Sequence, residues 1–299
     1  EPVLTSLNEQ FSGDVIFCSV SDDAEKLIIL HEQGCKPVEY LCFDRSTGTA
    51  THLFSANPKQ NNLPLVSMSP IEIKARDGLN LVCYLSKPAD AEKPGPMVLL
   101  VHGGPWWRDY WGMHPTHQWL ANRGYAVLSV NFRGSTGFGK AFVNASKMEW
   151  GGKMQTDLLD AVDWAIEEGI ADPDRVAIMG GSYGGFATLT GVTQAPKKFA
   201  CAVDLVGISN LISFLDTLPE YWKTWKFLYK TRLGDFTTEE GRAFLKERSP
   251  LTHVNRIEKP LLVIQGGTDV RVRQSESEQV VSAMQDHGIP VTYGLFPDE

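Results

Sequence analysis

The sequence predicts an α/β fold in which a mostly parallel, doubly wound sheet carries helices on both faces. From about residue 69 onward, strand-like and helix-like segments alternate, which is typical of crossover units in such sheets. The segments 97–101, 176–180 and 261–264 are continuous apolar runs, as expected for strands covered on both faces. Residues 1–60 are instead rich in short β-like runs and predict a separate antiparallel unit.

The predicted elements of the larger domain, residues 61–299, begin with two strands joined by a tight Asp77-Gly78 turn. The expected strands lie at 71–75, 79–85, 97–101, 126–131, 176–180, 200–205, 261–264 and 291–296. The expected helices lie at 116–123, 154–168, 185–194 and 275–287. An aromatic-rich insertion at 214–245 interrupts the alternation.

The first 60 residues predict strands at 14–20, 26–30 and 39–43, separated by turn residues. The turn D-R-S-T-G at 44–48 lies between two β-like runs, as in the outer strands of a propeller blade. This unit occurs once, so we interpret it as the remnant of a propeller. The polar segment 55–64 is the predicted linker.

Composition narrows the possible partners and compartments. A formal net charge of −8 disfavours nucleic acid and anionic membranes, both of which favour a basic face. No run approaches the ~18 apolar residues of a membrane span. Five scattered cysteines without C-x-x-C spacing predict reduced thiols, no metal site and a cytoplasmic protein. The composition is compatible with a homo-oligomer.

The strongest chemical signal is Gly180-Gly181-Ser182-Tyr183-Gly184-Gly185, between an apolar strand and a helical segment. In a G-x-S-x-G pattern with this setting, the serine occupies a tight strand-to-helix turn that exposes its hydroxyl, as in an α/β-hydrolase. Ser182 is therefore the predicted nucleophile. The alternative is a glycine-rich connection with an incidental serine.

A second element is His102-Gly103-Gly104-Pro105, directly after the predicted strand 97–101. Glycines at this place let backbone N–H groups face a negative oxygen. We expect the N–H groups of Gly104 and Tyr183 to form the oxyanion hole, and His102 to orient the loop. An ordinary glycine turn is the alternative.

The predicted acid is Asp269, which follows the strand 261–264 in Gln265-Gly266-Gly267-Thr268-Asp269. Its carboxylate would orient the imidazole of the base and stabilise its positive charge. A solvated loop aspartate is the alternative. The order serine, then aspartate, matches α/β-hydrolases, in which the histidine comes last.

The histidine base is missing from its expected place after the last strand. Only His287 follows Asp269 among the seven histidines, and it lies before that strand. We therefore interpret the sequence as cut just before its base and expect it to be a fragment of a longer enzyme. Attack of a serine hydroxyl on a carbonyl carbon, assisted by a histidine base, needs no cofactor.

Four motifs together resemble the prolyl oligopeptidase family of serine peptidases, in particular its acylaminoacyl-peptidase-like bacterial branch. They are H-G-G-P at 102–105, N-F-R-G-S-T-G-F-G at 131–139, G-G-S-Y-G-G-F at 180–186 and D-V-R-V at 269–272. The resemblance covers roughly residues 68–299. It implies that the segment 1–54 ends a β-propeller that admits only short peptides. It also implies that the histidine and a final helix follow shortly after Glu299.

Residues for the substrate pocket are predicted from their place beside these motifs. Trp106 and Trp107 adjoin the oxyanion loop, and the insertion supplies Tyr221, Trp222 and Trp225. Packing of the insertion onto the domain is the alternative for these aromatics. Arg133 would bind a substrate carbonyl or carboxylate, with a buried structural ion pair as its alternative.

The sequence thus predicts a serine peptidase that cleaves short peptides through an acyl-enzyme on Ser182. A carboxylesterase with the same machinery is the first alternative, because this fold does not select between amides and esters. An inactive fragment or binding module is the second, because the histidine is missing.

Overall fold

A computed structural model describes residues 2–91 and 94–299 of the chain. The chain folds into two compact units. Unit 1 comprises residues 1–70 together with 85–91 and 110–125, and unit 2 comprises 71–84, 92–109 and 126–299. Unit 1 therefore extends beyond the predicted β-rich segment 1–60. None of the described helices combines the length and hydropathy needed to cross a bilayer.

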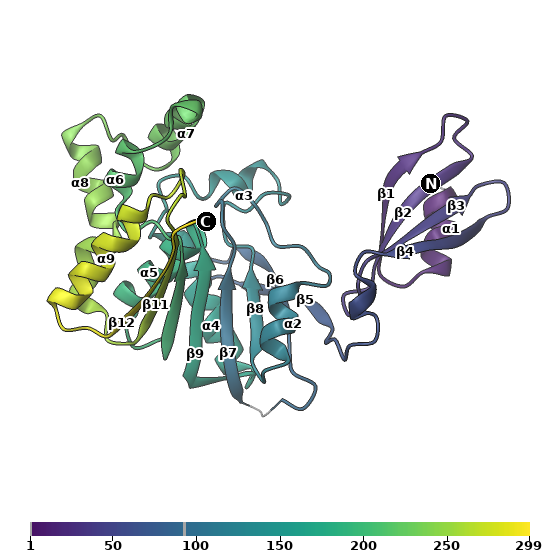
Figure 1. The fold of residues 1–299 in the computed structure, drawn as a ribbon, viewed down its shortest axis with the longest axis horizontal. Coiled ribbons are helices and arrows are strands. Elements are labelled where there is room, and N and C mark those ends of the chain that lie inside the picture. Colours follow the sequence, from purple (N-terminus) through teal and green to yellow (C-terminus); the bar gives the residue numbers. More distant parts are fainter. Residues whose placement is uncertain (1, 92–93) are drawn as a thin grey trace. The chain divides into compact units, whose positions relative to one another are not determined.

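Unit 1 contains a four-stranded sheet whose consecutive strands pair antiparallel (Figure 1). Its strands are β1 (Asp14–Val20), β2 (Lys26–Glu32), β3 (Glu39–Asp44) and β4 (Thr49–Ser55). Leu7 of helix α1 (Pro2–Gln10) joins Ile29, Leu41 and Phe43 in its core. The sequence did not predict α1. The 3₁₀ helix η1 (Pro58–Gln60) and helix α2 (Pro115–Ala121) complete the unit.

The second sheet has eight strands in the order β12-β11-β10-β9-β7-β8-β6-β5. The pairs from β12 to β8 along this order are all parallel, which confirms the predicted α/β fold. The strands are β5 (Met68–Lys74), β6 (Asn80–Ser86), β7 (Gly95–Val101), β8 (Ala126–Val130), β9 (Ala171–Gly181), β10 (Cys201–Leu205), β11 (Leu261–Gly266) and β12 (Val291–Phe296). All five residues of β8 are buried, as a central parallel strand requires.

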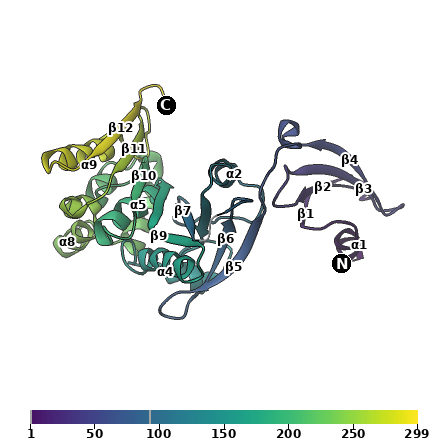
Figure 2. The same cartoon turned by 90° about the horizontal axis from the view of Figure 1, so that it is seen from below.

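Three long helices of unit 2 pack along this sheet (Figures 1 and 2). They are α4 (Lys153–Glu167), α5 (Tyr183–Gln194) and α9 (Gln274–Asp286). Residues 183–193 of α5 are all buried, because this helix packs against β7, β9 and β10. The short helix α3 (Lys140–Asn144) was not predicted.

The aromatic-rich insertion folds into short helices. Its elements are α6 (Leu211–Asp216), the 3₁₀ helix η2 (Glu220–Trp222), α7 (Lys223–Arg232) and α8 (Glu239–Arg248), followed by η3 (Pro250–Arg256).

Arg133 forms a buried ion-pair network with two aspartates. Its side chain donates to Asp157 at 2.9 and 2.7 Å and to Asp77 at 2.9 and 3.0 Å. The Arg133 and Asp157 side chains are 4% and 0% exposed. The hydrogen bonds from Arg133 lower the pKa of Asp77 to about 2. Together with the Arg133 backbone N–H, which lies 2.8 Å from Asp157, these bonds join α4 to the turn between β5 and β6.

Asp204 of β10 is a buried carboxyl of a different kind. It is fully buried, and neither carboxyl oxygen has a hydrogen-bond partner among the described residues that meets standard geometry. Its carboxyl fills the space beside Gly185 and Gly207, where a Cβ on either glycine would overlap it. Burial raises the pKa of Asp204 to about 7, and the backbone amide of Gly207 opposes this.

Removing the cation from the buried network should be costly. Arg133→Met leaves the Asp157 carboxylate buried and unpaired, so we expect a loss of about 3–5 kcal/mol in the free energy of unfolding. Arg76→Met is the matched control, because Arg76 also forms a hydrogen-bonded ion pair with an aspartate of α4, Asp160, but its side chain is 59% exposed. It should cost at most about 1 kcal/mol in urea unfolding. Equal losses in both variants would contradict this assignment.

The free energy of unfolding should depend on pH through Asp204. The unfolded chain ionises this carboxyl near its ordinary pKa of 3.8, whereas the folded chain keeps its proton up to about pH 7, so stability falls as pH rises between these values. Asp204→Asn removes this loss. We expect it to stabilise the protein by about 1–3 kcal/mol at pH 8 and not at pH 4. Urea titrations at both pH values measure the difference, and a pH-independent difference would contradict the expectation.

Candidate active site

Ser182 lies in the tight turn between β9 and α5, as the sequence predicts. Its backbone has φ +57° and ψ −116°, a conformation that costs a non-glycine residue about 1–3 kcal/mol. Two backbone hydrogen bonds hold it there, from Ser182 N–H to Leu205 at 2.9 Å and from Phe186 N–H to the Ser182 carbonyl at 3.0 Å. Gly184 is in turn pressed against Val101, the last residue of β7, with no room for a Cβ. These contacts place the serine at the carboxyl edge of the sheet.

One predicted oxyanion donor, Tyr183, directly follows Ser182, and the other, Gly104, lies in the loop after β7. Tyr183 is the first residue of α5, where a backbone N–H has no partner within the helix. Gly104 has φ +121°, which favours glycine, and the loop that carries it packs on the serine. A Cβ on Gly103 would lie 3.6 Å from the Ser182 Cβ. Backbone N–H groups and the positive end of α5 therefore favour an anionic oxygen here.

His102 is built into the base of the oxyanion loop. Its Nδ1–H donates to the Gly103 carbonyl at 2.7 Å, which leaves Nε2 to accept from the Ser135 hydroxyl at 2.9 Å. The ring stacks on Phe132 with centroids 4.4 Å apart. Burial lowers the pKa of His102 to about 4, so it is neutral at pH 7. These contacts support the predicted orienting role.

Asp269 lies in the turn after β11. Its Oδ1 accepts the backbone N–H groups of Arg271 at 2.8 Å and Val272 at 3.0 Å, which fixes the carboxylate. Asp269 and Ser182 line the same cavity, and so does Gly104. The structure therefore brings the predicted nucleophile, acid and one oxyanion donor to one place.

This cavity has a volume of about 260 Å³ and a mostly apolar and aromatic wall. Besides Ser182, Asp269 and Gly104, it is lined by Trp150, Val206, Ile208, Phe214, Trp222, Tyr229, Arg271 and Val272.

Of the predicted pocket residues, only Trp222 lines the cavity. Trp106 and Trp225 do not line the cavity but contact the wall residue Tyr229, with ring centroids 5.8 and 6.4 Å from its ring. Tyr221 packs edge-on against Trp222 and is 66% exposed.

Two other predicted pocket residues lie elsewhere. Trp107 is 60% exposed and does not line the cavity. Arg133 does not line it either, because Asp77 and Asp157 occupy its guanidinium. Its alternative, the buried ion pair, is what the structure contains.

Sequence reasoning missed several wall residues. Trp150 is 2% exposed and meets Tyr183 edge-on, with ring centroids 4.6 Å apart. It comes from the segment between α3 and α4, which no motif marks. Tyr229 and Phe214 lie within the aromatic-rich insertion. The sequence did not predict the helices of this insertion, so it did not show which of its aromatic side chains face the cavity.

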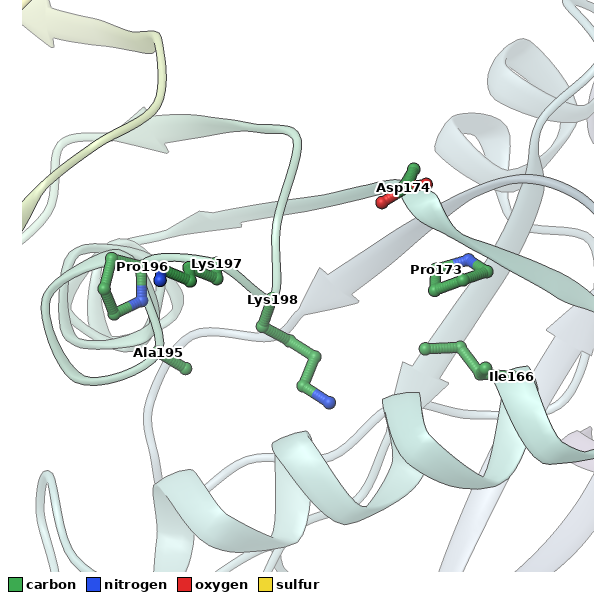
Figure 3. Close-up of a pocket in the computed structure, with 7 residues that line it drawn as sticks. All are labelled: Ile166, Pro173, Asp174, Ala195, Pro196, Lys197 and Lys198. Atoms are coloured by element: carbon green, nitrogen blue, oxygen red, sulfur yellow. The ribbon is translucent and has the colours of Figure 1, made fainter.

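A second cavity carries none of the predicted site residues (Figure 3). It is lined by Ile166, Pro173, Asp174, Ala195, Pro196, Lys197 and Lys198. Its residues come from the end of α4, the segment after α5 and the start of β9, whereas Ser182 follows the end of β9. Lys198 is paired with Asp163. This cavity is therefore separate from the serine site.

No histidine is among the residues that line the serine cavity in the described part of the chain. The prediction that the base follows Glu299 lies outside the described residues and stays a prediction. Residues 2–91 and 94–299 contain no group of three or more His, Cys, Asp or Glu side chains placed to hold a metal ion.

Comparisons with known proteins agree with these motifs. The model of the prolyl oligopeptidase family matches residues 111–299. Dipeptidyl aminopeptidase BIII of Pseudoxanthomonas mexicana is 55% identical over 295 residues, which are 96% of this chain and 43% of that protein. Dipeptidyl peptidase family member 6 of Caenorhabditis elegans is 42% identical, over 98% of this chain and 43% of its own length. The chain thus spans less than half the length of these curated relatives.

Solved structures show the same architecture. A puromycin-hydrolysing peptidase of Mycobacterium tuberculosis matches with a TM-score of 0.82 and 30% identity, over 91% of this chain and 42% of that one. Acylaminoacyl peptidase of Pyrococcus horikoshii matches with a TM-score of 0.83 and 25% identity, over 96% and 46%. The predicted α/β-hydrolase fold and the predicted family are both confirmed, and this chain belongs to the prolyl oligopeptidase family.

Proposed function

We propose that this chain carries the acyl-transfer site of a serine peptidase. The supporting observation is that Ser182, in a strained turn at the sheet edge, shares one cavity with the fixed carboxylate of Asp269. The Ser182 hydroxyl attacks the substrate carbonyl while a histidine base takes its proton, and Asp269 orients that base. The N–H groups of Gly104 and Tyr183 hold the oxyanion. The C–N bond then breaks, the amine leaves with the proton held by the histidine, and water hydrolyses the acyl-enzyme.

The proposed substrates are short peptides with an apolar residue on the acyl side of the cleaved bond. The wall residues Phe214, Trp222 and Tyr229 offer an apolar aromatic surface beside the serine. One relative is named a dipeptidyl aminopeptidase and another a dipeptidyl peptidase family member, and two similar structures are peptidases, which supports an amide as the scissile bond.

The proposal includes no nucleic-acid partner, in keeping with the net charge of −8. The five cysteines are unpaired in the structure, which supports a reducing compartment such as the cytoplasm. A homo-oligomer remains compatible with this function.

Labelling of the natural protein with a fluorophosphonate tests the nucleophile. We expect covalent labelling of Ser182 and its complete loss in Ser182→Ala, because the probe needs an activated serine. Ser69→Ala is the control, since Ser69 is exposed and does not line the cavity, and it should still label.

Hydrolysis assays identify the scissile bond in the same preparations. Aminoacyl-nitroanilides should be cleaved together with nitrophenyl esters. Cleavage of esters alone would favour the carboxylesterase alternative, and absence of Ser182 labelling would favour a binding module.

Arg271 supplies a test of peptide binding. Its side chain lines the cavity, and no carboxylate in the described ranges pairs with its guanidinium. We propose that it donates to a backbone carbonyl of the substrate.

Arg271→Gln should raise KM about tenfold with kcat within about twofold, since one charged hydrogen bond is lost in ground and transition states alike. Arg273→Gln, an exposed arginine outside the cavity, should leave KM unchanged. Equal changes in both variants would refute the assignment.

A further inference from the structure

Glu276 is a buried carboxylate whose hydrogen-bond donors all come from one short segment. Its residue is 1% exposed, although it lies in the first turn of α9. Oε2 accepts the backbone N–H groups of Ser209 at 3.0 Å and Asn210 at 2.9 Å. Oε1 accepts the Ser213 hydroxyl. A carboxylate thus saturated by donors is a strong, directional anchor.

The anchored segment forms part of the cavity wall. Ile208 directly precedes Ser209, and Phe214 directly follows Ser213, and both side chains line the cavity of Ser182. The carboxylate therefore holds the segment at both ends, immediately beside the two wall residues.

Further hydrogen bonds make this anchor specific. The Ser209 hydroxyl lies 2.7 Å from the Glu276 carbonyl, and Gln279, one turn further along α9, donates to that hydroxyl at 2.8 Å. Asn210 caps α6 by accepting the N–H of Ile212 at 3.0 Å. Helix α6 has only six residues. Its orientation therefore depends on the hydrogen bonds from its first residues to α9.

The other end of the anchor is the acid turn. Helix α9 begins at Gln274, directly after the turn in which Asp269 accepts the N–H groups of Arg271 and Val272. Arg271 and Val272 line the same cavity. The first turn of α9 therefore connects the predicted acid on one side with the wall segment on the other.

We propose that Glu276 is a positioning residue that sets the shape of the acyl pocket and thereby its preference for large apolar side chains. The inference rests on the proposed function, because it takes Ser182 as the nucleophile. Glu276 touches no reacting atom. It acts through Ile208 and Phe214, whose places it fixes relative to the acid turn.

The test compares Glu276→Gln with Glu278→Gln in the natural protein. Glutamine keeps the size of the side chain but presents an NH₂ group either to two backbone N–H groups or to the Ser213 hydroxyl. Glu278 lies on the same helix, is exposed and bonds only Gln274 among the described residues, so it is a matched control. The measured quantity is the ratio of kcat/KM for substrates with phenylalanine and with alanine on the acyl side.

For Glu276→Gln we expect this ratio to fall about tenfold, the equivalent of one misplaced hydrogen bond to a charged group. The rate of Ser182 labelling by a small fluorophosphonate should stay within about threefold, because a small probe does not fill the pocket. Glu278→Gln should leave both quantities unchanged.

An unchanged ratio, or an equal loss for both substrates and for labelling, would overturn the proposal. The second pattern would mean that Glu276 supports folding alone. If Glu276→Gln fails to fold, Ser213→Ala decides, because it removes the hydroxyl donor to Oε1 and keeps both backbone N–H donors to Oε2, and it should lower the ratio about threefold. A wild-type protein that neither labels nor cleaves amides would instead refute the proposed function.

Discussion

The backbone of Ser182 is the constraint on which the site depends. A serine at φ +57° persists only where its surroundings hold it, and here they include three neighbouring strands. Its N–H donates to the end of β10, its helix presses on the end of β7, and it follows β9 itself. The order β11-β10-β9-β7 then brings the turns after four adjacent strands to one edge. Gly104, Ser182, Val206 and Asp269 come from these four turns.

The sequence predicted the parts of this arrangement that local rules determine. Apolar runs identified the central strands, and glycines around Ser182 identified the turn, because close backbone approach leaves its mark in the residues themselves. The same reasoning located Gly104 and Asp269 directly after their strands.

Local sequence rules did not predict the features that depend on contacts between residues far apart in the chain. Whether Arg133 bound substrate or a buried aspartate depended on Asp157, which is 24 residues away along the chain. Trp150 lines the cavity because it packs edge-on against Tyr183, a contact that no spacing predicts. Tyr221 and Trp222 are adjacent in sequence, and only one of them reaches the cavity wall.

Three buried carboxyl groups show how much polar structure this core contains. Asp157 is paired with Arg133, and Glu276 is satisfied by hydroxyl and amide donors. Asp204 has no ion-pair partner among the described residues, and burial, opposed by the backbone amide of Gly207, raises its pKa to about 7. Since buried polar groups are costly, each of the three needs its own physical account: an ion pair for Asp157, a full set of hydrogen-bond donors for Glu276 and a raised pKa for Asp204.

The most direct measurement is a crystal structure of the natural protein with a phosphonate bound to Ser182. The account predicts that the phosphonyl oxygen accepts hydrogen bonds from the N–H groups of Tyr183 and Gly104, at about 2.7–3.1 Å. It also predicts that a histidine lies between the bound serine and the carboxylate of Asp269. A phosphonyl oxygen that faces solvent, or an Asp269 carboxylate directed away from any histidine, would contradict it.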